Sequence, residues 1–177
     1  TASLPPLMMD GPAPFTPEEF LFSNQAQLSA KDFEILTRVV EDRHEPEDHP
    51  FLKSWLDAEN QLRNALTRIR AGELKTNAEP YLREHDGFDV SIETRATDAM
   101  NMDNPLERER FLDRFRWRRL DDLTNADAFG FTAILAFIFK LKIVLRWQGI
   151  EVEGGRERLN EMIQTNVESV AEGKGGQ

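Results

Sequence analysis

The chain has 177 residues, no cysteine and a formal net charge of −10 from 22 basic and 32 acidic side chains. The absence of cysteine excludes disulfides, thiolate zinc sites and a cysteine nucleophile, and it fits a reducing compartment. The acidic balance argues against general nucleic-acid binding, which needs lysine and arginine to neutralise phosphates. The chain is long enough to bury one core, so we predict a single domain over residues 1–177.

The excess of negative charge is confined to the first part of the chain. Residues 1–104 carry ten basic and twenty acidic side chains, whereas residues 105–177 carry twelve of each. This division is typical either of two surfaces with different partners or of one solvated acidic face. We therefore distinguish an acidic helical part, residues 16–104, from core helices over residues 105–171.

The chain begins with a proline-rich stretch. Four prolines within residues 1–15 predict an irregular or extended lead-in. Thr16, Pro17 and Glu19 then combine an N-cap, a proline in the first turn and a capping-box glutamate, which together predict a helix start. The first residues also lack the basic-then-apolar pattern of a secretory leader, so a cytoplasmic location is expected.

Cap residues, apolar spacings of three or four and glycine stops predict the remaining helices. In chain order they are expected after Ser29, over 51–70, over 91–100, from Asn104 to Leu123, over 128–147 and over 156–171. Between them, residues 73–90 should form a loop with one short helical turn. Strand-like alternation is nearly absent, so the predicted fold class is all-α, a compact multi-helix bundle.

Glycines are expected to end two of these helices and to separate the last one from the chain before it. Gly72 lies near the end of the first long helix, Gly149 follows the core helix, and Gly154–Gly155 should separate a last amphipathic helix. The apolar residues of that last helix recur every three or four positions: Leu159, Met162, Ile163, Val167 and Val170. Residues 172–177 are expected to fray.

The most apolar stretch, residues 126–147, has sixteen hydrophobic residues in twenty-two positions. Its length would suffice to span a membrane. However, Lys140, Lys142 and Arg146 make insertion into lipid costly. We therefore predict a buried core helix and no direct membrane span.

Signals of catalysis are few. Glu41 and His44 have the i,i+3 spacing with which helices present a carboxylate and an imidazole to a metal, and His49 lies nearby. A metal-dependent helical enzyme built on these three residues is one hypothesis, and a solvated loop is the alternative. The chain has no glycine-rich phosphate loop, nucleophile elbow or dinucleotide fingerprint. We therefore expect neither an enzyme nor a cofactor.

Arginines are concentrated between residues 108 and 119, interleaved with acidic residues. One interpretation is an exposed helix stabilised by ion pairs between successive turns. The other is a surface for an acidic protein partner, bound by Arg116, Arg118 and Arg119. Trp117 discriminates between them, because an exposed tryptophan would serve as a contact anchor whereas a buried one would pack under the helix.

Two segments carry more specific patterns. Residues 51–72 contain an aromatic–Asp–Asn-x-Leu–Arg-x-Arg-Ala-Gly series, and residues 104–117 with 131–141 contain Asn-Pro-Leu-Glu-Arg-Glu, Asp-Arg-Phe-Arg-Trp and a long apolar run. These segments resemble helices of the C (or d) subunits of V- and A-type rotary ATPases. Nearly the whole chain is also similar to a bacterial family of uncharacterised proteins encoded beside V-type ATPase genes, including its opening Ala-Ser-Leu-Pro and residues 140–147.

The resemblance implies an all-helical, non-catalytic component equivalent to one or two lobes of a C subunit. In rotary ATPases the C subunit is a funnel-shaped socket that joins the central stalk to the membrane rotor ring. The implied partners are therefore stalk or rotor-ring subunits, with a peripheral position at the inner membrane through the complex. It also implies that residues 51–72 pack against residues 128–147.

This chain departs from C subunits in being about half as long and in carrying Lys142 and Arg146 where C subunits tend to be rich in glutamate. No contact residue of the family is carried over for that reason. A regulatory adaptor for an unrelated partner is a further alternative.

Overall fold

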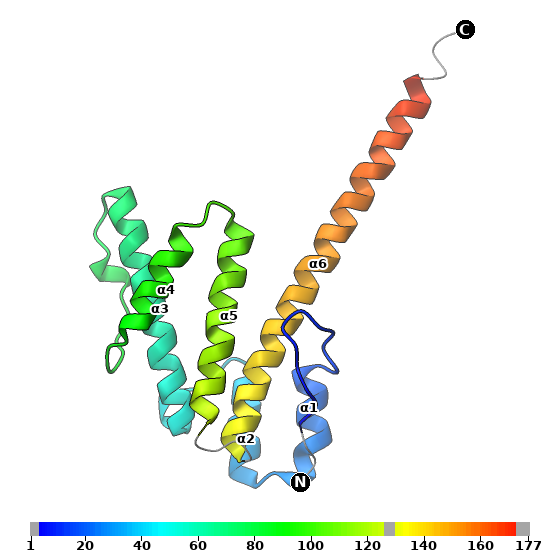
Figure 1. Cartoon of the computed structure of the whole chain (residues 1–177). Coiled ribbons are helices and arrows are strands. Elements are labelled where there is room, and N and C mark those ends of the chain that lie inside the picture. Colours follow the sequence, from blue (N-terminus) through cyan, green and yellow to red (C-terminus); the bar gives the residue numbers. More distant parts are fainter. Residues whose placement is uncertain (1–3, 126–129, 173–177) are drawn as a thin grey trace.

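The computed structural model describes residues 4–125 and 130–172, with side chains described as far as residue 153. The regular elements within these ranges are all helical, which confirms the all-α prediction (Figure 1). The α-helices are α1 (Pro17–Asn24), α2 (Ala30–Val40), α3 (Pro50–Leu74), α4 (Val90–Met100), α5 (Pro105–Thr124) and α6 (Phe131–Glu172). Short 3₁₀ helices cover Gln25–Gln27, Pro46–Asp48 and Glu79–Tyr81. The last of these is the helical turn expected between residues 73 and 90.

The predicted helix starts are confirmed by their hydrogen bonds. The Thr16 hydroxyl accepts from the Glu19 amide at 3.2 Å, while the Glu19 carboxylate accepts from the Thr16 amide at 2.8 Å. The Asn104 side-chain carbonyl accepts from the Leu106 amide at 2.9 Å and so caps α5. Each cap satisfies backbone donors that have no partner inside the helix.

The prediction that these glycines interrupt the helices is wrong. Helix α3 continues through Gly72 and ends at Leu74, and its C-cap residue Lys75 adopts the left-handed conformation with φ 55°. Helix α6 passes Gly149 and the pair at 154–155 without a break and is 42 residues long. A glycine inside a helix costs about 1 kcal/mol relative to alanine, and unlike proline it keeps its hydrogen-bond donor.

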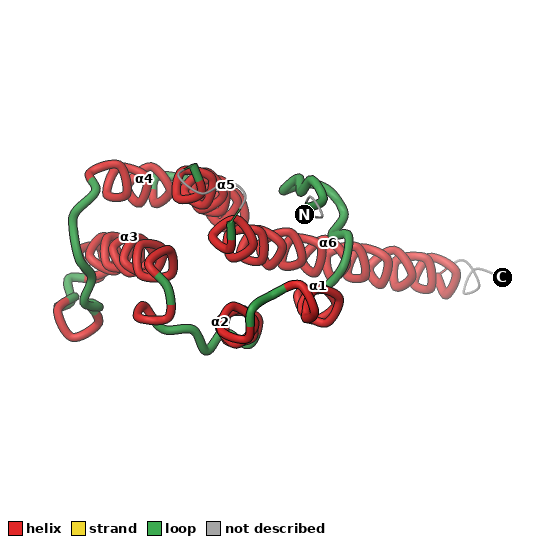
Figure 2. Tube along the Cα trace, turned by 90° about the horizontal axis from the view of Figure 1, so that it is seen from below, coloured by secondary structure: helices red, strands yellow, loops and turns green. Residues whose placement is uncertain are grey.

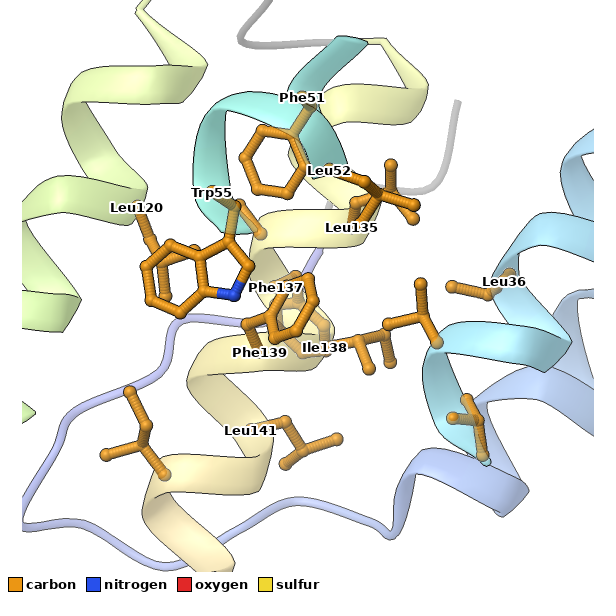
Figure 3. Close-up of a cluster of buried hydrophobic side chains, with 14 of the residues drawn as sticks. Leu36, Phe51, Leu52, Trp55, Leu120, Leu135, Phe137, Ile138, Phe139 and Leu141 are labelled. Atoms are coloured by element: carbon orange, nitrogen blue, oxygen red, sulfur yellow. The ribbon is translucent and has the colours of Figure 1, made fainter. Parts of the chain in front are cut away.

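The larger hydrophobic core joins the first half of α6 to α1, α2, the beginning of α3 and the end of α5. Figure 3 labels ten of its side chains: Leu36, Phe51, Leu52, Trp55, Leu120, Leu135, Phe137, Ile138, Phe139 and Leu141. The lead-in packs against this core through Leu4 and Leu7, and its described residues are irregular, as predicted. The apolar first half of α6 is thus a core helix.

A smaller core lies between the rest of α3, helix α4 and the start of α5. It consists of Ala58, Leu62, Ala65, Leu66, Ile92, Ala96, Ala99 and Leu112. Alanines in α3 and α4 allow the two helices to approach closely. Of residues 51–72, the first turns contact α6. The ring centres of Phe51 and Trp55 lie 6.2 and 5.2 Å from the ring centre of Phe139.

Helix α6 projects beyond the other described helices. Figure 1 shows its second half extending away from them, and Figure 2 shows the α3–α4 pair at the opposite end of the molecule. The projecting part comprises residues 148–172, which we call the α6 extension. The body formed by the other helices holds it at one end.

Candidate functional site

The arginines singled out on α5 are bound mainly to acidic residues of the body. The Arg116 guanidinium donates to both carboxylate oxygens of Glu59 on α3, at 2.9 and 3.1 Å, and to Asp113 at 3.0 Å. Arg119 donates to Asp89 at 3.3 Å, in the loop before α4. Arg118 is exposed, so it is the member of the three that this fold leaves facing solvent.

Trp117 is half-buried against the larger core. The Lys140 ammonium lies 5.0 Å from the centre of its ring, in cation–π geometry, and also pairs with Asp121. The indole therefore helps to join α5 to α6. A role for Arg118 in binding a partner stays a prediction.

Asp113 organises a buried polar network that was not predicted from the sequence. Its side chain is fully buried on α5. One carboxylate oxygen accepts a hydrogen bond from the Trp147 indole at 2.8 Å, and the same carboxylate pairs with Arg146 and Arg116. The sequence did contain a signal for the burial of Asp113. This residue precedes the core residue Leu120 by two helical turns and therefore lies on the same face of the helix.

The Asp113 network lies at the point where α6 leaves the body. Arg146 and Trp147 belong to the last turn of α6 before the extension. Arg110 lies over the Trp147 ring, 5.2 Å from its centre, and pairs with Asp10 of the lead-in. Contacts from α5 and the lead-in therefore hold this turn and set the direction of the extension.

Lys142 makes a second polar connection between α6 and the body. Its ammonium donates to the backbone carbonyl of Val39 at 2.7 Å and to the Asp42 carboxylate at 2.5 Å, at the end of α2. Lys142 and Arg146 are both cations in the later part of the core helix predicted over residues 128–147. In this structure both bind acidic groups of their own chain.

The extension begins with exposed apolar side chains. Ile150 and Val152 are 36% and 56% exposed. Leu145, Gln148, Gly149, Val152 and Glu153 share one open face of this part of α6. The first described turns of the extension therefore offer a partly apolar helix face.

Glu41, His44 and His49 do not converge. Glu41 pairs with Arg43. His49 caps α3 by accepting from the Phe51 amide at 3.2 Å, and the His44 ring packs edge-on against Phe139 at 5.3 Å. Within residues 4–125 and the described side chains of α6, no three His, Cys, Asp or Glu residues are grouped so that they could hold a metal ion. The geometry gives the metal-enzyme hypothesis no support.

His44 should make stability depend on pH. Burial lowers its pKa below the ordinary value of 6.5, Lys142 acts in the same direction, and the carboxylates of Asp42, Asp48 and Glu45 act against it. The unfolded chain then binds this proton more readily, so stability should fall as pH drops through about 6.5 and towards the folded pKa.

Urea unfolding at a series of pH values between neutral and mildly acidic tests this dependence. The substitution H44Q should flatten the decline, while H85Q serves as the control and should retain it. Equal pH profiles for the wild type and H44Q would contradict the expectation.

None of the helices searched within the described ranges is both long and apolar enough to cross a membrane. The charged residues of α6 account for this result, since Lys140, Lys142 and Arg146 interrupt its apolar half.

A family model described as "Protein of unknown function (DUF2764)" matches residues 96–169. The match covers less than half of the chain and includes the end of α4, all of α5 and most of α6. A search of the curated proteins and a search of the solved structures each give no significant match.

Proposed function

We propose that this protein is a non-catalytic connector that binds another protein through the α6 extension. The observation that carries the proposal is the 42-residue helix whose first half is built into the core and whose second half projects from the body. Most helical stability in proteins comes from packing an amphipathic face against another element. A projecting helix with apolar positions every three or four residues is therefore suited to pack on a partner.

The region matched by the family model contains the helices on which this proposal rests. The matched family region begins at residue 96 and reaches residue 169, near the end of α6. The matched span contains the positions of Asp113, Arg146 and Trp147 and most of the extension that they orient. A rigidly held helix loses less conformational entropy on binding than a flexible tail would.

We further propose that the partner is a stalk or rotor-ring subunit of a bacterial V-type ATPase, where this protein would act as a subunit or accessory protein. The support comes from the resemblance of residues 51–72, 104–117 and 131–141 to C-subunit helices. An all-helical fold with distinct surfaces is compatible with such a role. The protein would then lie at the inner membrane through the complex.

Co-purification tests the partner class. A tagged full-length chain should be expressed from its own locus in the native host, and the proteins that elute with it should be quantified by mass spectrometry. Stalk or rotor-ring subunits should be enriched over a tagged protein of similar size and charge. Enrichment of an unrelated protein would favour the adaptor alternative, and the absence of ATPase subunits would overturn the proposed partner.

The substitution Val152→Glu should weaken partner binding through the extension. It places a charge on an exposed apolar position of this helix face, so it should reduce co-purification about tenfold, as expected for losing roughly 1.4 kcal/mol of binding energy. The melting temperature should change little, because Val152 is 56% exposed. Arg63→Gln is a matched control, since it changes the charge by the same amount at an exposed position of α3. Equal recovery with V152E and R63Q would contradict the role of the extension.

A further inference from the structure

A row of polar side chains on α3 binds the backbone of the segment before α4. Asn64 donates to the Arg83 carbonyl at 2.7 Å and accepts from the Arg83 amide at 2.8 Å. Gln61 makes the same pair of bonds with Asp89, at 2.9 and 3.0 Å. Both amide side chains are almost completely buried, with 3% and 2% exposure for Gln61 and Asn64.

Two more contacts hold the middle of this segment. Asn60 donates to the Glu84 carbonyl at 3.1 Å, and Asp57 accepts from the Asp86 amide at 3.1 Å. Residues 83–89, which we call the clamped loop, are therefore bound along their length by successive turns of one helix. Paired amide–backbone bonds of this kind imitate the pairing of a neighbouring strand, so the loop has one defined conformation.

This rigid loop exposes apolar side chains. Phe88 is 69% exposed and the adjoining Val90, at the start of α4, is 68% exposed. Gly87 makes the turn before Phe88 with φ +75°, a conformation that residues with a side chain rarely adopt. A groove of about 270 Å³ lies beside Phe88 and is lined further by Ala58, Ile92 and Arg119.

Around Phe88, four carboxylates and three cations leave a net charge of −1. Glu84 and Asp86 are exposed, and Asp57 and Asp89 line the groove. The nearby cations Lys53 and Arg119 are paired, Lys53 with Asp86 and Asp57 at 2.5 and 3.2 Å and Arg119 with Asp89. Arg83 adds one exposed positive charge. The loop therefore carries a small excess of negative charge, and Glu84 is the exposed carboxylate that forms no ion pair among the described residues.

We propose that the clamped loop is a docking surface for a protein that offers an apolar pocket bordered by lysine or arginine. Phe88 and Val90 would enter the pocket, and Glu84 and Asp86 would face its basic rim. Exposed aromatic anchors on preorganised loops bind with a small entropic cost, and the acidic rim selects a basic partner. The loop and the α6 extension lie at opposite ends of the molecule in both views (Figures 1 and 2).

This inference rests on the proposed connector function, because a connector needs two separate binding surfaces. The contacts that carry it belong to α3 and the loop before α4 and do not involve α6. The two surfaces can therefore be tested independently.

Site-specific photo-crosslinking in the native host provides the test. A benzophenone amino acid is placed at position 88, at position 152 or at position 22, one at a time, and the crosslinked peptides are identified by mass spectrometry. Phe22 is the matched control, because it is an 81% exposed phenylalanine on α1 outside the clamped loop. We expect position 88 to crosslink a peptide that contains apolar residues flanked by lysine or arginine.

Two further measurements check the stated chemistry. Glu84→Lys should lower the crosslinking yield at position 88 about fivefold while leaving the yield at position 152 unchanged, and added salt should act in the same direction. The same partner at equal yield from positions 22 and 88, an acidic target peptide, or no effect of Glu84→Lys would overturn the docking surface. Loss of crosslinks at position 152 alone would instead count against the proposed role of the α6 extension.

Discussion

Replacing Asp113 by alanine should lower the free energy of unfolding by about 3 kcal/mol, because it removes one member of a buried charged network and leaves the Trp147 donor and the arginines without their shared acceptor. The carboxylate is fully buried, whereas the side chains of Arg116 and Arg146 remain 20% and 46% exposed. Water can therefore partly replace Asp113 at the arginines, which places the expected loss at the lower end for buried ion pairs. Denaturant unfolding measures the change.

Asp121→Ala is the control for this substitution. Asp121 lies on the same helix and pairs with Lys140, but its side chain is 55% exposed, so its replacement should cost less than about 1 kcal/mol.

Spin labels at positions 63 and 152 would report the direction of the α6 extension. The distance distribution should broaden in the Asp113 variant and remain narrow in the Asp121 variant. Equal stability of the two variants would refute the organising role of Asp113.

Replacing Phe139 by alanine should cost about 3–5 kcal/mol, as expected for removing a large buried ring from a packed core. Phe139 is 9% exposed and contacts the rings of Phe51, Trp55 and His44. It is the main aromatic link between α3 and α6 in Figure 3. Removing this ring should therefore weaken the packing of the beginning of α3 against the core helix.

The matched control is Phe22→Ala. Phe22 is 81% exposed on α1, so the same chemical change should alter the free energy of unfolding by no more than about 0.5 kcal/mol. Thermal or denaturant unfolding of the two variants measures the difference directly. A loss below 1 kcal/mol for Phe139 would mean that the neighbouring rings close the cavity, and it would contradict the assigned packing.

The two proposed surfaces would make this protein a bridge. The α6 extension offers a projecting helix whose base is held by Asp113 and Lys142, and the clamped loop offers Phe88 on an acidic, rigid support. Their different chemistry follows the division of charge between residues 1–104 and 105–177. Each surface is proposed to bind a different neighbour, which matches the role of a connector in a larger assembly.

Local signals in the sequence predicted much of the fold. The caps at Thr16, Ser29 and Asn104 act within a few residues, so their hydrogen bonds depend little on the rest of the chain. The 3–4 spacing of apolar residues likewise identified α2 and α3 as helices with a buried face, and the long apolar run identified the first half of α6 as a core helix. The His49 cap of α3 was missed, because histidine is not among the residues commonly found at that position.

The candidate sites depended more on tertiary contacts. The sequence placed Arg116, Arg118 and Arg119 on one helix, but only the fold shows that Glu59 and Asp89 bind two of them. Gln61 and Asn64 look like ordinary polar residues of an amphipathic helix, and their pairing with residues 83–89 requires a chain reversal after α3. Glycine stop signals also proved weak, since α6 continues through them.

The sequence by itself determined the helical class, most helix starts, the buried character of the first half of α6 and the uneven distribution of charge. These properties arise from neighbours within one or two helical turns or from composition alone. Only the tertiary structure decided which charges are used inside the fold, how the Asp113 network orients α6, and where Phe88 is exposed. The physical reason is that burial and pairing of a side chain depend on residues far away in the chain, which local spacing does not specify.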